Sequence, residues 1–242
     1  MKLEKNNKLD NYQYYLTAEY DCGYLKHHRS QSLVVAHPEK LEKNEVSNLI
    51  SNGFRRSGIH IYKPDCKSCN KCIPIRVDVT NFRPNRTQKR IIKRYQYLDI
   101  SLDQLEFSDE DFLLYDQYQK IKHNEFTDSD KNNRNDYINY LLTSNTETKK
   151  ITFKHQSKLK IITILDIFDN SISAVYTFYD VKSNQESYGT YSILWLIEWA
   201  KKNKIKHIYL GYWINESVKM RYKTNFKPFE LLINNQWQQF YE

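Results

Sequence analysis

Three cysteines stand at two-residue spacing in the basic stretch GFRRSGIHIYKPDCKSCNKCIPIR: Cys66, Cys69 and Cys72. Thiolates at this spacing can hold a tetrahedral zinc ion, and a run of three also suits an iron–sulfur cluster. Cys22 is the fourth cysteine of the chain and completes a candidate set of four metal ligands. The spacing alone does not choose between zinc, a cluster and four reduced thiols, and any metal would brace this segment.

The positive charge of the chain is concentrated around these cysteines. Between Gly53 and Arg94 there are twelve Lys or Arg residues and two Asp or Glu residues, a net charge of +10. The whole chain carries +8, so the remainder sums to −2, and residues 99–136 alone carry −7. A basic patch confined to one segment suits a phosphate backbone, although a solvated basic surface is the alternative.

The bulk composition is that of an ordinary globular protein. The chain has 242 residues, of which 40% are hydrophobic and 27% charged, enough to build a sizeable core. The first residues lack the apolar core of a signal peptide, and no uncharged apolar run is long enough to span a bilayer. We therefore expect a cytoplasmic protein without a membrane partner, in which free thiols or metal ligands are favoured over disulfides.

The charge reversal near residues 95–105 is the expected domain boundary. It separates a small Cys-containing basic domain, residues 1–98, from a second domain, residues 99–242. In the first, the cysteine segment predicts short strands and turns. In the second, FSDEDFLLYDQYQKIK predicts a helix that Ser108 caps. The apolar stripe expected on this helix is Phe112, Leu113, Tyr115 and Ile121.

The C-terminal sequence alternates between strands and helices. KITFKH, KLKIITILDIF and ISAVYTFYD are rich in β-branched and aromatic residues and predict strands. In the third strand we expect Ala174, Tyr176 and Phe178 on one face. YGTYSILWLIEWAKKN predicts a helix and IKHIYLGYWI a further strand, so the strand–helix–strand order predicts a right-handed parallel crossover. The expected fold class is α/β (α+β), with a mixed sheet and helices packed on it as in a GNAT-like core.

Several stretches together resemble a known family. DCGYL, GFRRSGIHIYKPDCKSCNKCIPIRV, SAVYTFYD through SYGTYSIL, and YLGYWINESVKMRYKTNFKPFE are similar in order and spacing to the bacterial aspartate/glutamate leucyltransferases, within the arginyl-tRNA–protein transferase family. The resemblance runs from about Tyr14 to Trp237 and is weakest over residues 95–150. Eukaryotic members carry a second Cys in the position of Leu25, so metal chemistry claimed for them does not transfer to this chain.

The resemblance implies an enzyme that takes leucine from leucyl-tRNA and attaches it to the α-amino group of proteins that begin with Asp or Glu. The product would carry an N-degron, which marks it for proteolysis. The resemblance also implies a GNAT-like C-terminal half, in agreement with the pattern of strands and helices. Aminoacylated tRNA and acidic N-termini are thus the expected partners, and DNA is not.

This reaction is the aminolysis of an activated ester. A free α-amine has a pKa of ~7.7, so a useful fraction is neutral at pH 7. The enzyme would need positioning, an oxyanion partner and at most a modest base, with no required cofactor. Asp166 matches an acidic position in the family's strand and is a candidate for the reaction centre with Tyr176 and Tyr191. The leucyl side chain needs an apolar slot, for which the candidates are Tyr176, Phe178, Tyr191 and Trp213, ordinary core being the alternative.

The acceptor and the tRNA each need cationic groups. Arginine is well shaped to grip the acceptor carboxylate, and the candidates are Arg55, Arg56 and Arg76, with Lys63 in support. The tRNA backbone needs a basic surface, for which the candidates are Arg83, Arg86, Lys89, Arg90, Lys93 and Arg94. The helix that begins at residues 190–192 offers free N–H groups to the 3′ end of the tRNA. In KMRYKTNF, Lys219, Tyr222 and Lys223 are expected on one helical face near the terminal adenosine.

Three other functions fit parts of the sequence. An arginyl-tRNA donor would require an acidic pocket, which the apolar strands do not obviously provide. A non-catalytic, metal-bearing RNA-binding protein explains the basic cysteine segment but leaves the C-terminal half unexplained. An acetyl-CoA acetyltransferase explains the C-terminal half, but SYGTYS is poor in Gly for a pyrophosphate-binding loop.

Overall fold

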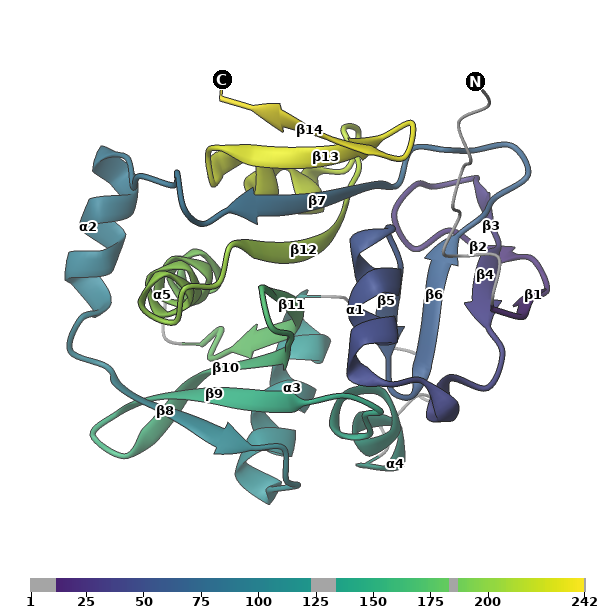
Figure 1. The fold of residues 1–242 in the computed structure, drawn as a ribbon. Helices are drawn as coiled ribbons and strands as arrows, with labels where there is room; N and C mark the ends of the chain where they lie inside the picture. The colour runs from purple at the N-terminus through teal and green to yellow at the C-terminus, as the bar shows by residue number, and fades with distance from the viewer. Residues whose placement is uncertain (1–11, 123–133, 183–186, 242) are drawn as a thin grey trace.

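The computed structural model describes residues 12–122, 134–182 and 187–241, and its main feature is an eight-stranded mixed sheet (Figure 1). The strand order is β14-β13-β7-β12-β11-β10-β9-β8. In chain order the strands are β7 (Ile73–Asp78), β8 (Asp99–Gln104), β9 (Thr148–His155), β10 (Lys158–Ile167), β11 (Ser171–Tyr179), β12 (His207–Trp213), β13 (Phe229–Ile233) and β14 (Gln236–Phe240).

The N-terminal part forms a second, smaller sheet, seen at the right of Figure 1. Its four strands are β1 (Tyr14–Leu16), β4 (Ser32–Val35), β6 (His60–Pro64) and β5 (Arg55–Ser57), in that spatial order. A two-stranded ribbon, β2 (Tyr20–Asp21) and β3 (Arg29–Ser30), lies beside it. The short strands and turns predicted for the cysteine segment are confirmed.

The described helices are α1 (Lys43–Ser51), α2 (Arg86–Tyr95), α3 (Asp109–Lys122), α4 (Arg134–Tyr137) and α5 (Tyr188–Lys202). Shorter helical turns span Pro38–Lys40, Ile138–Leu142 and Val218–Asn225. None of the described helices is both long and apolar enough to cross a membrane. The helix predicted at α3 is confirmed, and the hydroxyl of Ser108 accepts a hydrogen bond from the backbone N–H of Asp111 at 3.3 Å.

The predicted apolar stripe of α3 is partly wrong. Leu113 and Ile121 are 57% and 47% exposed, whereas Leu114 and Tyr115 are buried. The buried face is the one that packs on β10 and β11. Packing against the sheet, and not the local run of apolar residues, therefore determines which side chains of α3 are buried.

The predicted crossover is confirmed. Strand β11 runs antiparallel to β10 and parallel to β12, and α5 connects β11 to β12. α5 and α2 cover one face of the large sheet, while α3 and α4, and separately α1 with the N-terminal sheet, cover the other (Figure 1). The fold is therefore the expected GNAT-like mixed sheet with a small N-terminal unit.

Strand β7 links the two halves of the chain. The sequence analysis assigned these residues to the N-terminal domain, and in the structure they pair with β12 and β13 inside the large sheet. α2 likewise packs beside α5. The domain boundary expected at residue 98 stays a prediction, but the N-terminal residues clearly contribute to the main core.

Candidate active site

Strands β11 and β12 separate beyond a short paired region, and this opening is the centre of the candidate site. Their parallel pairing extends from Ser171 only as far as Ser173, opposite Tyr209. Just beyond, β11 has one extra residue, Val175, relative to β10, and β12 shifts register against β7 before Tyr212. Such bulges turn a strand and leave backbone groups without their ladder partners.

The bulge at Val175 also corrects the predicted alternation in β11. Tyr176 and Phe178 pack in the core on the side of α3, whereas Ala174 packs in the core on the side of α5. The extra residue reverses the alternation between Ala174 and Tyr176, so the expectation that all three share a face is wrong.

Arg55 of β5 occupies the opening between the two strands. Its Nη2 donates a hydrogen bond to the carbonyl oxygen of Val175 at 3.2 Å, and its Cζ lies 5.9 Å from the ring centre of Tyr212. Gly211 has a φ of +75°, and a Cβ built there would lie 2.7 Å from Cζ of Arg55. Glycine at 211 thus permits both the backbone conformation and the close approach of the guanidinium.

Arg55 has no acidic partner among the described residues. Burial disfavours its charged form, and the groups that favour this form are the hydroxyls of four tyrosines, Tyr62, Tyr24, Tyr212 and Tyr222. A guanidinium that is withdrawn from water normally has a carboxylate or phosphate as counter-ion. Its electrostatic surroundings therefore suit an anionic ligand.

Lys223 places a second basic group at this position. Its side chain is 5% exposed, and its Nζ donates to the carbonyl oxygen of Tyr212 at 2.6 Å. Burial, followed by the charge of Arg55, lowers the pKa of Lys223 well below its usual value. The two residues come from β5 and from the turn at 218–225, which lie far apart in the sequence.

The predicted common face of Lys219, Tyr222 and Lys223 is wrong. The segment Val218–Asn225 is a 3₁₀-helix, in which residues three apart are aligned. Lys219 and Tyr222 are exposed, while Lys223 points inward to Tyr212.

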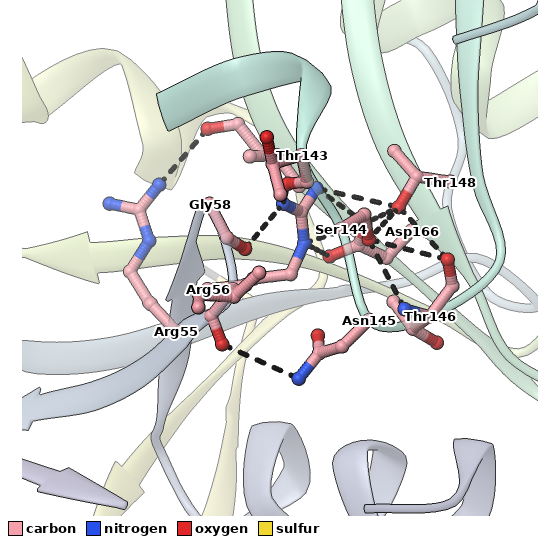
Figure 2. A network of polar contacts seen from close by, with 11 residues as sticks. Arg55, Arg56, Gly58, Thr143, Ser144, Asn145, Thr146, Thr148 and Asp166 are labelled. Carbon is pink, nitrogen blue, oxygen red and sulfur yellow. Dashed lines mark hydrogen bonds and ion pairs between the residues drawn. The ribbon is translucent and has the colours of Figure 1, made fainter. Parts of the chain in front are cut away.

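Arg56, the neighbour of Arg55, lies in a closed polar network (Figure 2). Its Nε lies 2.9 Å from Oδ2 of Asp166 and its Nη2 lies 2.8 Å from Oδ1, with both side chains fully buried. Its Nη1 donates to the carbonyl oxygens of Gly58 and Thr143. Thr148 Oγ1 donates to Oδ1 of Asp166 at 2.6 Å. In this arrangement the guanidinium of Arg56 has no donor left for a substrate, and the carboxylate of Asp166 is not open to an amine.

The network fixes the position of Arg55. Adjacent side chains of a strand point to opposite faces, and Figure 2 shows Arg55 pointing away from the Arg56 network. Because Arg56 ties β5 to β10 through Asp166, the backbone that carries Arg55 is held against the large sheet. The sequence analysis proposed Arg56 as a ligand of the acceptor carboxylate and Asp166 as a residue of the reaction centre. In the structure the two side chains instead form an ion pair with each other.

Two cavities approach Arg55 from different sides. The first, here called the α5 cavity, has a volume of about 320 Å³. Its lining is Tyr118, Thr177, Tyr179, Ser187, Gly189, Thr190, Ile193 and Tyr222. The side chain of Ser187, the N-cap residue of α5, makes no hydrogen bond to the first N–H groups of the helix, and this N-terminal turn borders the cavity. Among the described lining residues there is no Asp or Glu.

The second cavity, here called the cysteine cavity, has a volume of about 300 Å³. Tyr24, Tyr62 and Tyr212 line it, together with all four cysteines. Arg55 itself lines neither cavity, but three of the tyrosines whose charges act on it border the cysteine cavity and the fourth, Tyr222, borders the α5 cavity.

The four cysteines are free thiols that share this cavity. Cys66 Sγ lies 3.7 Å from the carbonyl oxygen of Gln31. Burial, and then the charges of Cys66, Cys22 and Cys69, raise the pKa of Cys72 to about 12. Within the part of the chain that the structure describes, no three His, Cys, Asp or Glu side chains are grouped as a metal ion would require. As placed, the cysteines do not fit the predicted set of four ligands.

Two further acceptor candidates lie away from Arg55. Arg76 Nε is 2.5 Å from Oε2 of Glu230, and its Cζ lies 4.2 Å from the ring centre of Trp237. Lys63 lies over the ring of Phe54, on the face of β6 opposite to Tyr62. Neither residue is brought to Arg55, and their predicted function stays a prediction.

The predicted leucyl slot is largely core. Phe178 and Tyr191 are 0% and 4% exposed, and Tyr176 packs against the rings of Tyr115 and Phe178. Trp213 is partly buried. The α5 cavity is lined instead by Tyr118, Thr177 and Tyr179, which sequence reasoning missed because nothing in the local pattern distinguishes them from other aromatic and strand residues.

The predicted tRNA-binding residues of α2 are all exposed: Arg86, Lys89, Arg90, Lys93 and Arg94. Arg83, also exposed, donates to the carbonyl oxygens of Thr80 and Phe82 before the helix begins. The side chains on α2 therefore present a cationic face to solvent.

Known proteins resemble this chain over nearly its whole length. Models of the arginine-tRNA-protein transferase N terminus and C terminus match residues 20–90 and 110–233. The aspartate/glutamate leucyltransferase of Methylobacillus flagellatus is 42% identical over 238 residues, covering 98% of this chain and 96% of the relative. That of Thiobacillus denitrificans is 40% identical over 226 residues, covering 93% and 94%.

Solved structures of similar fold include the following domain. It is the C-terminal domain of a putative lysylphosphatidylglycerol synthetase from Agrobacterium fabrum, with a TM-score of 0.52 and 10% identity over 80% of this chain and 62% of that chain. At this identity the likeness concerns the fold alone. On the sequence matches, the chain belongs to the arginine-tRNA-protein transferase family.

Proposed function

We propose that this protein transfers leucine from leucyl-tRNA to the α-amino group of proteins that begin with Asp or Glu. The family and the names of its relatives support this reaction, and the product would carry an N-degron. The observation in the structure that carries the proposal is Arg55, a partly buried guanidinium without an acidic partner among the described residues. We place the reaction in the cytoplasm, where the aminoacyl-tRNA donor is available.

Arg55 binds the side-chain carboxylate of the acceptor. The guanidinium presents donors in a planar fork, which suits a carboxylate, and the amine of Lys223 lies nearby. The acceptor enters through the cysteine cavity, past Tyr24 and Tyr62. Arg56 and Asp166 do not touch the substrate and act as positioning residues for Arg55.

The leucyl ester occupies the α5 cavity. The uncapped N–H groups at the start of α5 stabilise the oxyanion that forms on the ester carbonyl. The amine nitrogen bonds to the carbonyl carbon, the ester bond to the tRNA ribose breaks, and the proton released by the amine reaches the departing ribose oxygen. Each step uses groups that the substrates bring, so the reaction requires no cofactor.

The lining of the α5 cavity favours leucine over arginine as the transferred residue. An arginyl side chain would require a buried acid, and the described lining residues include none. The rings of Tyr118 and Tyr179 supply apolar surface there, and the polar groups of the described lining side chains are uncharged hydroxyls.

A transfer assay tests the proposal. Total tRNA is charged separately with labelled leucine or arginine and mixed with the protein and with peptides that begin with Asp, Glu, Lys or Ala. We expect label on the Asp and Glu peptides with the leucyl donor alone. Arginine on the same peptides would overturn the donor, and transfer from neither donor would overturn the enzymatic function.

A further inference from the structure

Helices α2 and α5 are neighbours on one face of the large sheet (Figure 1). A groove of about 250 Å³ runs along α5 beside α2. Its α5 wall includes Trp195 and Trp199, whose four-residue spacing places them on one helical face, with Leu194 beside them. Ile92 of α2 forms part of the opposite wall. Both indole rings are partly exposed, so the groove presents aromatic surface to solvent.

Positive charge borders this aromatic groove. Lys89 lies one turn before Ile92 on α2, and Lys202 lines the far end of the groove. The cationic face of α2, with Arg86, Arg90, Lys93 and Arg94, continues along the same helix, and no described carboxylate forms an ion pair with any of these residues. Glu198 also lines the groove, but its carboxylate lies 3.7 Å from Nζ of Lys201.

The groove begins close to the α5 cavity. Thr190 and Ile193 line the cavity, while Tyr191, Leu194 and Trp195 line the groove. With a helical rise of 1.5 Å per residue, Thr190 and Trp199 are separated by about 14 Å along α5. The two sets of residues lie on different faces of α5, so a nucleic acid strand whose end lies in the α5 cavity reaches the groove by passing around the helix as well as along it.

We propose that the groove between α2 and α5 stacks an unpaired base of the tRNA, with the α2 lysines and arginines on the flanking phosphates. Aromatic side chains beside cations are the usual means of holding single-stranded nucleic acid, since every base has a face that can stack. The aromatic side chains of α5 suit a base that is not stacked on its neighbours in the RNA, and the cations of α2 complement the negative charge of the RNA backbone. This inference rests on the proposed function in one respect, namely that tRNA is the substrate.

Binding of uncharged tRNA tests the inference without any transfer step. The dissociation constant is measured at several salt concentrations for the wild type and for Trp199→Leu, Trp199→Tyr and Lys89→Gln. We expect Trp199→Leu to weaken binding about tenfold, as for the loss of one stacked base, and Trp199→Tyr to bind within about twofold of the wild type. Lys89→Gln should reduce the slope of log K against log salt by about one. Lys40→Gln, an exposed lysine on the N-terminal side, is the matched control.

A second variant, Ile92→Glu, places a carboxylate on the opposite wall, and we expect it to weaken tRNA binding even where a change at Trp199 disturbs folding. Unchanged binding by Trp199→Leu and Ile92→Glu would overturn the inference, as would equal losses in Trp199→Leu and Trp199→Tyr. A protein that binds tRNA through the groove but transfers no leucine would overturn the proposed function and keep this site. Leucyl transfer by a protein whose tRNA binding does not change in the groove variants would overturn this site and keep the proposed function.

Discussion

Arg55 and Arg56 are neighbours in the sequence and identical in chemistry, yet the structure gives them opposite surroundings. Arg56 is fully buried, with the carboxylate of Asp166 against its Nε and Nη2 and two carbonyl oxygens against its Nη1. Among the described residues, Arg55 has one hydrogen bond, to the carbonyl oxygen of Val175, and tyrosines around it. The two residues are adjacent in one strand, yet the charge of Arg56 is neutralised by groups of the protein, whereas that of Arg55 is left for a ligand to neutralise.

The difference shows what to look for in a site that binds an anion. Arg76, with Glu230 as its partner, resembles Arg56 in this respect. A buried cation with a complete set of internal partners contributes to the structure, whereas a cation held in a shaped opening without an acid is available for recognition. The predictions below test the contrast through protein stability, from the largest expected change to the smallest.

Removing the guanidinium of Arg56 should have the largest effect on stability. In Arg56→Ala the carboxylate of Asp166 stays buried without its counter-ion, so we expect a loss of about 3–5 kcal/mol in the free energy of unfolding. Denaturant unfolding followed by circular dichroism measures it. The double variant Arg56→Ala/Asp166→Ala should be less destabilised than the sum of the single changes, and strict additivity would contradict the pairing.

Gly211→Ala should have an intermediate effect on stability and should also reduce transfer. The added Cβ meets the guanidinium of Arg55 at 2.7 Å, and the φ of +75° strains any residue other than glycine, so we expect a loss of about 1–3 kcal/mol. Gly23→Ala is the matched control, because a Cβ there has nothing within 4 Å and should cost almost no stability. Equal behaviour of the two variants in thermal unfolding would mean that Arg55 does not lie over Gly211.

Removing the guanidinium of Arg55 should have the smallest effect on stability. Arg55→Ala loses one hydrogen bond and no ion pair, so we expect the free energy of unfolding to change by no more than about 1 kcal/mol. The same unfolding experiment measures this change beside Arg56→Ala. A loss as large as that of Arg56→Ala would show that Arg55 is a structural residue.

The elements whose contacts are local were predicted well from the sequence. Periodicity identified α5 and the strands β9 to β12, and the cap at Ser108 marked the start of α3. The membership of β7 in the large sheet was missed, because its partners β12 and β13 lie more than 120 residues away along the chain. No local pattern records a pairing over such a separation.

The candidate site was predicted less completely. The alternation of strand residues does indicate that Arg55 and Arg56 face opposite ways, but it does not tell which of them meets Asp166. The bulge at Val175 and the inward direction of Lys223 depend on how β11, β12 and the turn at 218–225 meet. Gly211 was a usable signal, since a glycine inside a predicted strand often marks a bulge or a close approach.

The most direct test of the account compares kcat/KM for two peptides that differ only in an N-terminal Asp or Asn. The measurement is made with leucyl-tRNA and with the wild type, Arg55→Ala and, as a control on the other face of the N-terminal sheet, Lys63→Ala. Truncating one partner of a charge-assisted contact costs about 2–4 kcal/mol, so we predict that the preference for Asp falls by about 30- to 1000-fold in Arg55→Ala and is kept in Lys63→Ala. An unchanged Asp preference in Arg55→Ala would contradict the assignment of Arg55 to the acceptor carboxylate.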